Sequence, residues 1–263
     1  RLPAQCPVCS KRVTIFGHGT QRVEEELQRK FPGITYLRMD SDTMRRGKDY
    51  EATLDRFREG QADVLLGTQM IAKGLDFPNV TLVGIIFADL GLHIPDFRAG
   101  ERTFQLLTQV AGRSGRTAEK TGKVFIQSWQ PEHKSVQFAK RHDYLNFARQ
   151  ELEYRKNLDY PPFSRLINIM FKSKDPNLVG QVAEVFTQAL RTKAGGYPVL
   201  GPSPAAVYRM QRFFRWEAIV KIPLGLAQDG IEELMDATFA YYETIKPEGA
   251  SNVRINVNVD AIA

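Results

Sequence analysis

The sequence contains very few cysteines and has no long apolar segment. Only Cys6 and Cys9 occur in 263 residues, too few for the disulfide framework of a small secreted domain. No apolar run approaches the roughly 20 residues that a membrane-spanning helix needs, and no basic-then-apolar signal peptide opens the chain. These absences predict a cytoplasmic protein with no membrane partner. Because the chain starts at Arg1 rather than at methionine, we interpret it as a piece of a longer protein.

The sequence also lacks an acidic excess. Its net charge is +6, and residues 1–150 hold 23 Lys and Arg against 17 Asp and Glu, whereas residues 151–263 hold 13 of each. A basic surface attracts polyanions such as nucleic acid. The alternative interpretation, that this charge serves only solubility, stays open on charge alone.

Strands and helices are predicted to alternate over the first 130 residues. Apolar runs rich in β-branched residues predict strands, and apolar residues at helical spacing predict helices, of which the first could be capped by Thr20. The run Val80–Phe87 fits a central parallel strand covered on both faces. This order predicts an α/β fold, a parallel sheet wrapped by helices. The predicted strands are 13–16, 34–39, 64–66, 80–87 and 123–128, and the predicted helices are 20–31, 49–59 and 101–111.

The second half of the chain has a different order of elements. A helical segment at 131–158 is broken by Tyr160-Pro161-Pro162-Phe163, which predicts a domain boundary there. The following elements give the β-α-β-β-α-β order of an α+β, ferredoxin-like domain. Its predicted strands are 165–172, 198–210, 216–222 and 253–259, and its predicted helices are 177–191 and 229–244. We therefore place domains at 13–158 and 159–263.

The segment Gln109–Arg116 has the pattern Q-x-x-G-R-x-G-R. Arg113 and Arg116 are two fixed cations in a turn loosened by Gly112, and a guanidinium matches the oxygens of a phosphate. This pattern favours contact with the phosphate of a bound nucleotide. The alternative is a basic helix end that complements the helix dipole.

A polar, glycine-containing segment follows the strand predicted at 64–66. Open α/β sheets bind ligands at such strand ends. Gly74 permits close backbone approach, and Asp76 can accept hydrogen bonds from a ribose. Thr68 suits a nucleic-acid phosphate. The alternative is an ordinary loop between a strand and a helix.

The arginines Arg209, Arg212 and Arg215 lie beside Phe213, Phe214 and Trp216. Interleaved basic and aromatic residues suit single-stranded or branched nucleic acid. The alternative is that alternate residues from Trp216 onward form one buried strand face. We expect Trp216 to be buried and the arginines to be exposed.

Two segments resemble motifs V and VI of superfamily-two helicases, namely G-T-Q-M-x-x-K-G-x-D-F and Q-V-A-G-R-S-G-R. The segments Phe16–Leu27, Ala88–Leu107 and Tyr160–Phe163 are similar to the PriA (primosomal protein N′) family of replication-restart helicases. The resemblance implies the second RecA-like lobe of a helicase, followed by a C-terminal domain of ribosomal-protein-like fold. It is strong over 6–129 and weaker beyond about 175.

The resemblance implies a role for each matching residue. Arg113 and Arg116 would face ATP and Mg²⁺ held by another lobe, with Gln109, Gly112, Gly74 and Asp76 near the nucleotide. Thr68, Gln69 and Lys73 would lie at the junction of nucleotide and DNA. The arginine cluster would bind DNA or a partner.

The implied function is a 3′→5′ DNA helicase that restarts stalled replication forks, located in the bacterial cytoplasm with the nucleoid. The implied partners are single-stranded and forked DNA, single-strand-binding protein and other primosome proteins. The alternatives are another superfamily-two translocase for fork repair, and a fork-binding module without turnover. The sequence has no G-x-x-x-x-G-K-[ST] motif and no Asp-Glu-x-His box, so we expect this piece alone to be inactive as an ATPase.

The pair Cys6 and Cys9 resembles the end of a cysteine-rich zinc region, which would occupy residues 1–12. A structural zinc ion needs four ligands, and this pair supplies two. The resemblance therefore implies a Zn²⁺ half-site, whereas an isolated C-x-x-C is more often a chance or redox pair.

Overall fold

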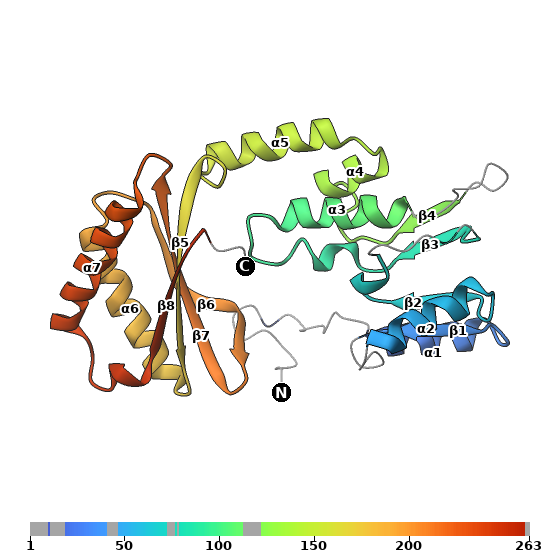
Figure 1. The fold of residues 1–263 in the computed structure, drawn as a ribbon, viewed down its shortest axis with the longest axis horizontal. Helices are drawn as coiled ribbons and strands as arrows, with labels where there is room; N and C mark the ends of the chain where they lie inside the picture. The colour runs from blue at the N-terminus through green and yellow to red at the C-terminus, as the bar shows by residue number, and fades with distance from the viewer. Residues whose placement is uncertain are drawn as a thin grey trace. The chain divides into compact units, whose positions relative to one another are not determined.

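The computed structural model describes residues 10, 19–40, 47–72, 77, 79–112 and 122–260. The chain forms two compact units. Unit 1 comprises residues 1–92 and 100–142, and unit 2 comprises residues 93–99 and 143–263 (Figure 1). None of the described helices is both long enough and apolar enough to cross a membrane.

Unit 1 is built from parallel strand pairs and helices, as the alternating pattern predicts. β1 (Tyr36–Met39) pairs in parallel with β2 (Val64–Gly67), and β3 (Leu82–Ile85) pairs in parallel with β4 (Lys123–Ile126). Met39, Leu54 and Phe77 form a buried cluster, against which Leu65 of β2 packs, and the Phe57 ring meets the Phe77 ring edge-on at 5.0 Å. The elements are α1 (Thr20–Lys30), β1 (Tyr36–Met39), α2 (Gly47–Arg58), β2 (Val64–Gly67), η1 (Gln69–Ala72), β3 (Leu82–Ile85), η2 (Ala88–Leu90), α3 (Ala99–Ala111), β4 (Lys123–Ile126) and α4 (Lys134–Lys140).

Three details of the sequence-based prediction are corrected. Strand β3 is shorter than the run at 80–87, and one face is open, since Leu82 is 59% exposed. Helix α1 has Gly19 as its N-cap, and the Thr20 hydroxyl donates to Asp40 instead of capping the helix. The helical segment at 131–158 is two helices, because the side chain of Asp143 caps the second one.

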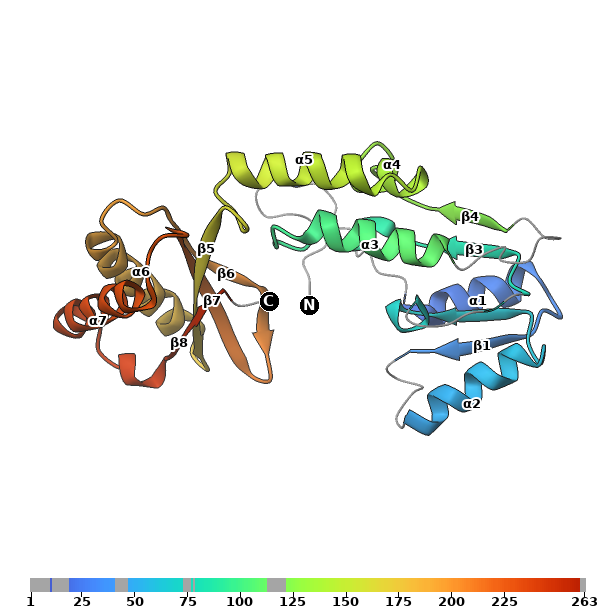
Figure 2. The same cartoon turned by 45° about the horizontal axis from the view of Figure 1, so that its top comes forward.

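Unit 2 contains a four-stranded antiparallel sheet with the order β6-β7-β5-β8. Helices α6 and α7 pack on one face of this sheet (Figure 2). The β-α-β-β-α-β order predicted from the sequence is confirmed. The elements are α5 (Tyr144–Asn157), β5 (Ser164–Ser173), α6 (Pro176–Lys193), β6 (Val199–Met210), β7 (Phe213–Pro223), α7 (Gln228–Ile245), η3 (Ala250–Asn252) and β8 (Arg254–Val259).

The core of unit 2 follows from the alternation of residues along β5. Ile167, Ile169 and Phe171 are completely buried and point toward the helices. Burial of each such side chain contributes about 1.5–3 kcal/mol. Helix α6 begins where the Asp175 carboxylate accepts hydrogen bonds from two backbone N–H groups, with Pro176 at the first helical position. This core fixes one face of the sheet against the helices.

Candidate functional site

The carboxyl end of β2 places Thr68 and Gln69 at the surface. Gly67, the last residue of this strand, packs against β1, since an added Cβ would lie 2.5 Å from the Met39 carbonyl oxygen and 2.8 Å from a methyl group of Ile71. Only glycine allows this approach. Thr68 and Gln69 follow directly and are both exposed. Three further predicted residues of this segment lie outside the described residues, namely Lys73, Gly74 and Asp76.

Helix α3 places Gln109 on its exposed side near the C-terminal end. The opposite side of the helix carries Phe104 and Leu107, which are both buried. Gly112 follows the helix and is exposed, and its N–H donates to the Thr108 carbonyl at 3.1 Å. The side chain of Gln109 and the backbone of Gly112 are therefore accessible to a ligand. Two residues of the same motif lie outside the described residues, namely Arg113 and Arg116.

A buried carboxylate ties the end of β3 to the end of β4. Asp89 is 4% exposed and accepts hydrogen bonds from the Ser128 hydroxyl at 2.8 Å, the Trp129 N–H at 3.0 Å and the Gln130 N–H at 3.1 Å. Burial by itself would raise the pKa of Asp89, but these hydrogen bonds, led by the Trp129 N–H, outweigh burial and hold the pKa below its ordinary value. Asp89 therefore stabilises the carboxyl edge of these strands. Sequence reasoning missed this role, although an aspartate directly after an apolar strand was an available clue.

A second polar network joins α1 to the carboxyl end of β1. The Arg38 guanidinium pairs with Glu24 at 2.8 Å and with the buried carboxylate of Asp40 at 3.0 Å. Thr20 also donates to Asp40, and the Tyr36 hydroxyl donates to Glu24 at 2.7 Å. The hydrogen bond from Tyr36, followed by that from Arg38, lowers the pKa of Glu24. This network fixes the start of α1, and no pattern in the sequence indicated it.

Unit 2 brings together two segments that the sequence analysis noted separately. The ring of Phe97 stacks on the ring of Tyr160 with centroids 5.1 Å apart and planes 11° apart. The guanidinium groups of Arg98 and Arg155 lie 5.1 and 4.9 Å from the Phe97 centroid, and the Lys221 ammonium lies 3.7 Å from the Tyr160 centroid. Such cation–π contacts are favourable, more so when water is excluded.

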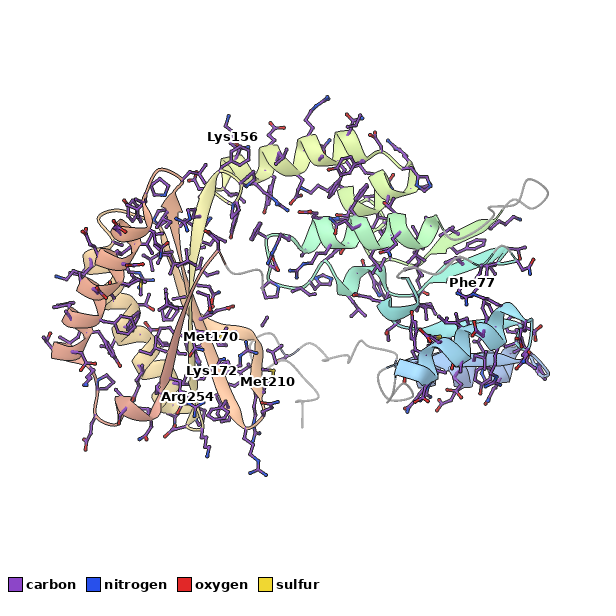
Figure 3. The ribbon with its side chains drawn as sticks, in the orientation of Figure 1. Phe77, Lys156, Met170, Lys172, Met210 and Arg254 are labelled. Atoms are coloured by element: carbon purple, nitrogen blue, oxygen red, sulfur yellow. The ribbon has the colours of Figure 1, made fainter. Side chains whose placement is uncertain are left out.

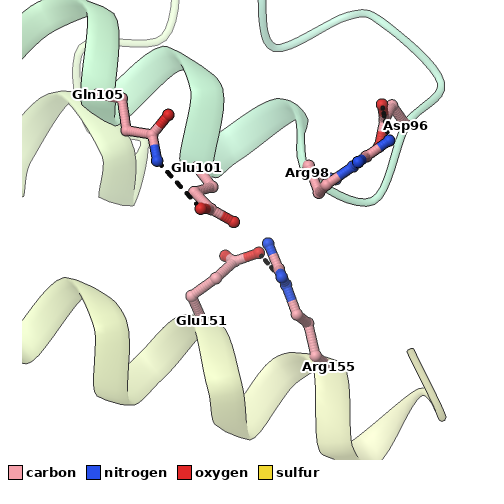
Figure 4. A network of polar contacts seen from close by, with 6 residues as sticks. All are labelled: Asp96, Arg98, Glu101, Gln105, Glu151 and Arg155. Carbon is pink, nitrogen blue, oxygen red and sulfur yellow. Dashed lines mark hydrogen bonds and ion pairs between the residues drawn. The ribbon is translucent and has the colours of Figure 1, made fainter. Parts of the chain in front are cut away.

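Ion pairs orient the two arginines of this cluster (Figure 4). Arg98 pairs with Asp96 through Nε at 3.2 Å, and Arg155 pairs with Glu151 at 3.0 Å. Lys221 also donates to the Leu158 carbonyl at 2.6 Å, and burial lowers the pKa of its ammonium group. These partners indicate that the aromatic cluster is a packing centre of unit 2 rather than an open ligand site.

The arginine cluster lies on the hairpin between β6 and β7. Arg209 and Arg212 are exposed, and Arg215 is half-buried. Gln211 and Arg212 form the two-residue turn, with φ angles of 50° and 70°, which fits a type I′ turn. The ring of Trp216 packs against the core beneath the helices, but the residue is only partly buried, so the expected full burial is wrong. The expected exposure is confirmed for Arg209 and Arg212 and is wrong for Arg215.

The predicted zinc half-site cannot be placed, because Cys6 and Cys9 lie outside the described residues. Within the described ranges, no three His, Cys, Asp or Glu side chains are grouped so as to hold a metal ion. The zinc half-site stays a prediction.

Comparison with known proteins matches the two halves of the chain to two families. Residues 7–118 match the helicase conserved C-terminal domain, and residues 156–262 match the primosomal protein N C-terminal domain. By sequence, this chain belongs to the PriA family as its C-terminal portion. The residues that match the primosomal domain, 156–262, include the antiparallel sheet of unit 2.

Several curated PriA proteins are similar to the chain. It is 47% identical to replication restart protein PriA of Bacillus subtilis over 84% of this chain and 28% of the relative. It is 40% identical to PriA of Synechocystis over 99% of this chain and 30% of the relative, and 35% identical to PriA of Haemophilus influenzae over 98% and 35%. The chain thus spans about a third of the length of these relatives.

Proposed function

We propose that the whole protein is an ATP-dependent 3′→5′ DNA helicase that recognises stalled or branched replication forks and restarts replication by primosome assembly. The observation behind this proposal is the order of two family matches on one chain, a helicase C-terminal domain at 7–118 and a primosomal C-terminal domain at 156–262. Similar proteins named for replication restart support it. Such a protein acts in the bacterial cytoplasm, at the nucleoid.

In this proposal unit 1 supplies one side of the nucleotide site. Arg113 and Arg116 stabilise the charge that develops on the transferred phosphate, and Gln109, Gly112, Gly74 and Asp76 contact the nucleotide. The accessible positions of Gln109 and Gly112 at the end of α3 are compatible with this role. ATP with Mg²⁺ would supply the phosphoryl group, held mainly by another lobe of the whole protein.

DNA contacts are proposed for both units. Thr68, Gln69 and Lys73 follow β2, where exposed polar groups can hold a phosphate.

Arg209, Arg212 and Arg215 contribute to binding forked DNA or the acidic tail of single-strand-binding protein. Arg212 lies in a left-handed conformation that is rare for a side chain of this size. The exposed side chain of Arg212 is accessible to a phosphate in this turn. Cys6 and Cys9 are proposed as two of the four ligands of a Zn²⁺ ion.

DNA-stimulated ATP hydrolysis by the whole protein tests this function. Arg113→Ala and Arg116→Ala should each reduce hydrolysis by roughly 10³–10⁵-fold, while binding of a fluorescent ATP analogue is largely kept. Arg141→Ala, at an exposed position of unit 1, is the matched control and should hydrolyse ATP normally. If both arginine variants keep near-normal turnover, the proposed role is wrong. If the unaltered protein binds forks but hydrolyses no ATP, it is a fork-binding module instead.

A further inference from the structure

In the part of unit 2 that the structure describes, the sheet has one face covered by helices and one face without a helix, called here the open face (Figure 2). Helices α6 and α7 cover the face that carries Ile167, Ile169 and Phe171. Side chains alternate along a strand, so their neighbours point to the opposite side. None of these neighbours is fully buried. They include Asn168, Met170 and Lys172 on β5, Phe213, Arg215 and Glu217 on β7, and Arg254, Asn256 and Asn258 on β8.

Three cations lie in one row across this open face. Lys172 is directly opposite Arg215 on β7 and directly opposite Arg254 on β8; Figure 3 labels Lys172 and Arg254 on the sheet. Side chains directly opposite one another share a face, with Cβ atoms about 4.5–5.5 Å apart, and like charges in this position are destabilising. Among the described residues, none of the three makes an ion pair. The nearest acid on the same face of β7, Glu217, is opposite Met170 instead.

The groups around the row are those that bind a nucleic-acid strand. The Arg254 guanidinium lies 5.7 Å from the Phe213 centroid, and Phe213 is only half-buried. Asn256 and Asn258 follow along β8, one and two rows from the cations. Cations for phosphates, an aromatic ring for stacking and amides for base edges are the combination found at single-strand sites.

We propose that this face binds single-stranded DNA through an open-face site composed of Lys172, Arg215, Arg254 and Phe213. Arg212, in the hairpin turn, directly precedes Phe213 of this site, whereas Arg209 is opposite Phe214 and lies on the other face. The proposal rests on the DNA-binding function proposed above. It specifies which residues bind, which face of the sheet they share, and that the bound DNA is single-stranded. Four strands about 4.8 Å apart span about 14 Å, which is too wide to enter a major groove of about 12 Å. The flat face therefore suits a flexible single strand better than a duplex.

Binding by the 263-residue chain tests the site. The test variant is Lys172→Glu/Arg254→Glu. The control is Lys156→Glu/Lys193→Glu, which makes the same change of net charge at exposed positions on α5 and α6. Fluorescence anisotropy with a labelled oligothymidylate of about 15 nucleotides should show at least about tenfold weaker binding for the test variant. The slope of log affinity against log salt should fall by about 0.7 for each phosphate that the variant no longer neutralises, and the control should match the unaltered chain.

A stability measurement separates a binding defect from a folding defect. Lys172→Glu alone places an acid between two opposing arginines, so its thermal midpoint should equal or exceed that of the unaltered chain. The same variant should bind the oligonucleotide more weakly. A lower midpoint together with unchanged binding would contradict the proposal on both counts.

Three other outcomes of the binding measurements separate an error in the open-face site from an error in the proposed DNA-binding function. If the unaltered chain binds DNA and the test variant binds it equally, the open-face site is wrong while the proposed DNA-binding function stands. If the unaltered chain binds no DNA, the DNA-binding function proposed for this chain fails. If the test variant no longer binds an Asp- and Glu-rich peptide but still binds DNA, the face is a peptide site and the proposal is overturned.

Discussion

The ring of Phe97 lies nearly parallel to the ring of Tyr160, 5.1 Å away. The two residues are 63 positions apart in the sequence, yet both belong to unit 2. The segment 93–99 thus precedes a helix of unit 1 and packs with the C-terminal unit. Its stacking partner comes from the segment Tyr160–Phe163, which explains physically why both segments contain aromatic residues.

We expect Phe97 and Tyr160 to be energetically coupled. In a double-mutant cycle of Phe97→Leu and Tyr160→Leu, the coupling energy should be roughly 0.5–1.5 kcal/mol, because stacked rings contribute this much beyond the area they bury. Urea unfolding followed by circular dichroism measures it. A parallel cycle of Phe97→Leu with Phe163→Leu is the control and should give a value near zero. Equal coupling in both cycles would show that the stacking has no specific role.

Asp89 should stabilise unit 1 in a pH-dependent way. Because its pKa is lower in the folded state than the ordinary value of 3.8, its stabilising effect is present above that ordinary value and is lost as the pH falls through the folded-state pKa. Asp89→Ala should lower the free energy of unfolding by about 1.5–3 kcal/mol near pH 7, with a smaller loss in acid.

Urea unfolding at a series of pH values from neutral to acid checks this. Ser128→Ala is the control, since it removes one of the three donors and keeps the charge; its effect should be smaller. A loss of stability in Asp89→Ala that is the same at every pH would show that the carboxylate charge is not what matters.

Gly67 should tolerate no side chain. In Gly67→Ala the added carbon would lie 2.5 Å from the Met39 carbonyl oxygen, so the pairing of β1 with β2 would have to shift. We expect a loss of at least about 2 kcal/mol, as for other overpacked sites. Gly84→Ala is the matched control, because it lies in a strand with nothing within 4 Å of an added carbon. The thermal midpoints of both variants measure the effect, and similar midpoints would contradict the proposed close approach.

The left-handed conformation of Arg212 should make the hairpin between β6 and β7 less stable than it would be with glycine at this position. Its φ of 70° costs a non-glycine residue roughly 1–2 kcal/mol, so Arg212→Gly should raise the free energy of unfolding by about 1 kcal/mol. Arg209→Gly, in the adjoining strand, should lower it instead. If Arg212 also contacts a phosphate, Arg212→Gly should bind DNA more weakly while being more stable. Weaker binding without a gain in stability would argue against the strained turn.

The sequence by itself determined the order and type of most of the described elements; the strand predicted at 13–16 lies outside the described residues. The alternation along 253–259 predicted a strand, observed at Arg254–Val259, and the predicted helix at 177–191 is observed at Pro176–Lys193. These features depend on local periodicity and caps, which act over a few residues. The motif containing Gln109 and Gly112 was also evident, because its residue types and spacing are local. Its proposed roles stay predictions.

Only the tertiary structure decided which distant residues are neighbours. The row of Lys172, Arg215 and Arg254 depends on strand order and register, and the sequence pattern gives the face of each side chain but not its partner. The buried hydrogen bonds of Asp89 and the stacking of Phe97 on Tyr160 arise in the same way. Leu82 lies on β3 within an apolar run and is nevertheless exposed, which shows that composition does not decide burial. Each of these depends on which surfaces pack together, because hydrophobic contacts are non-directional and become specific only through the complete fold.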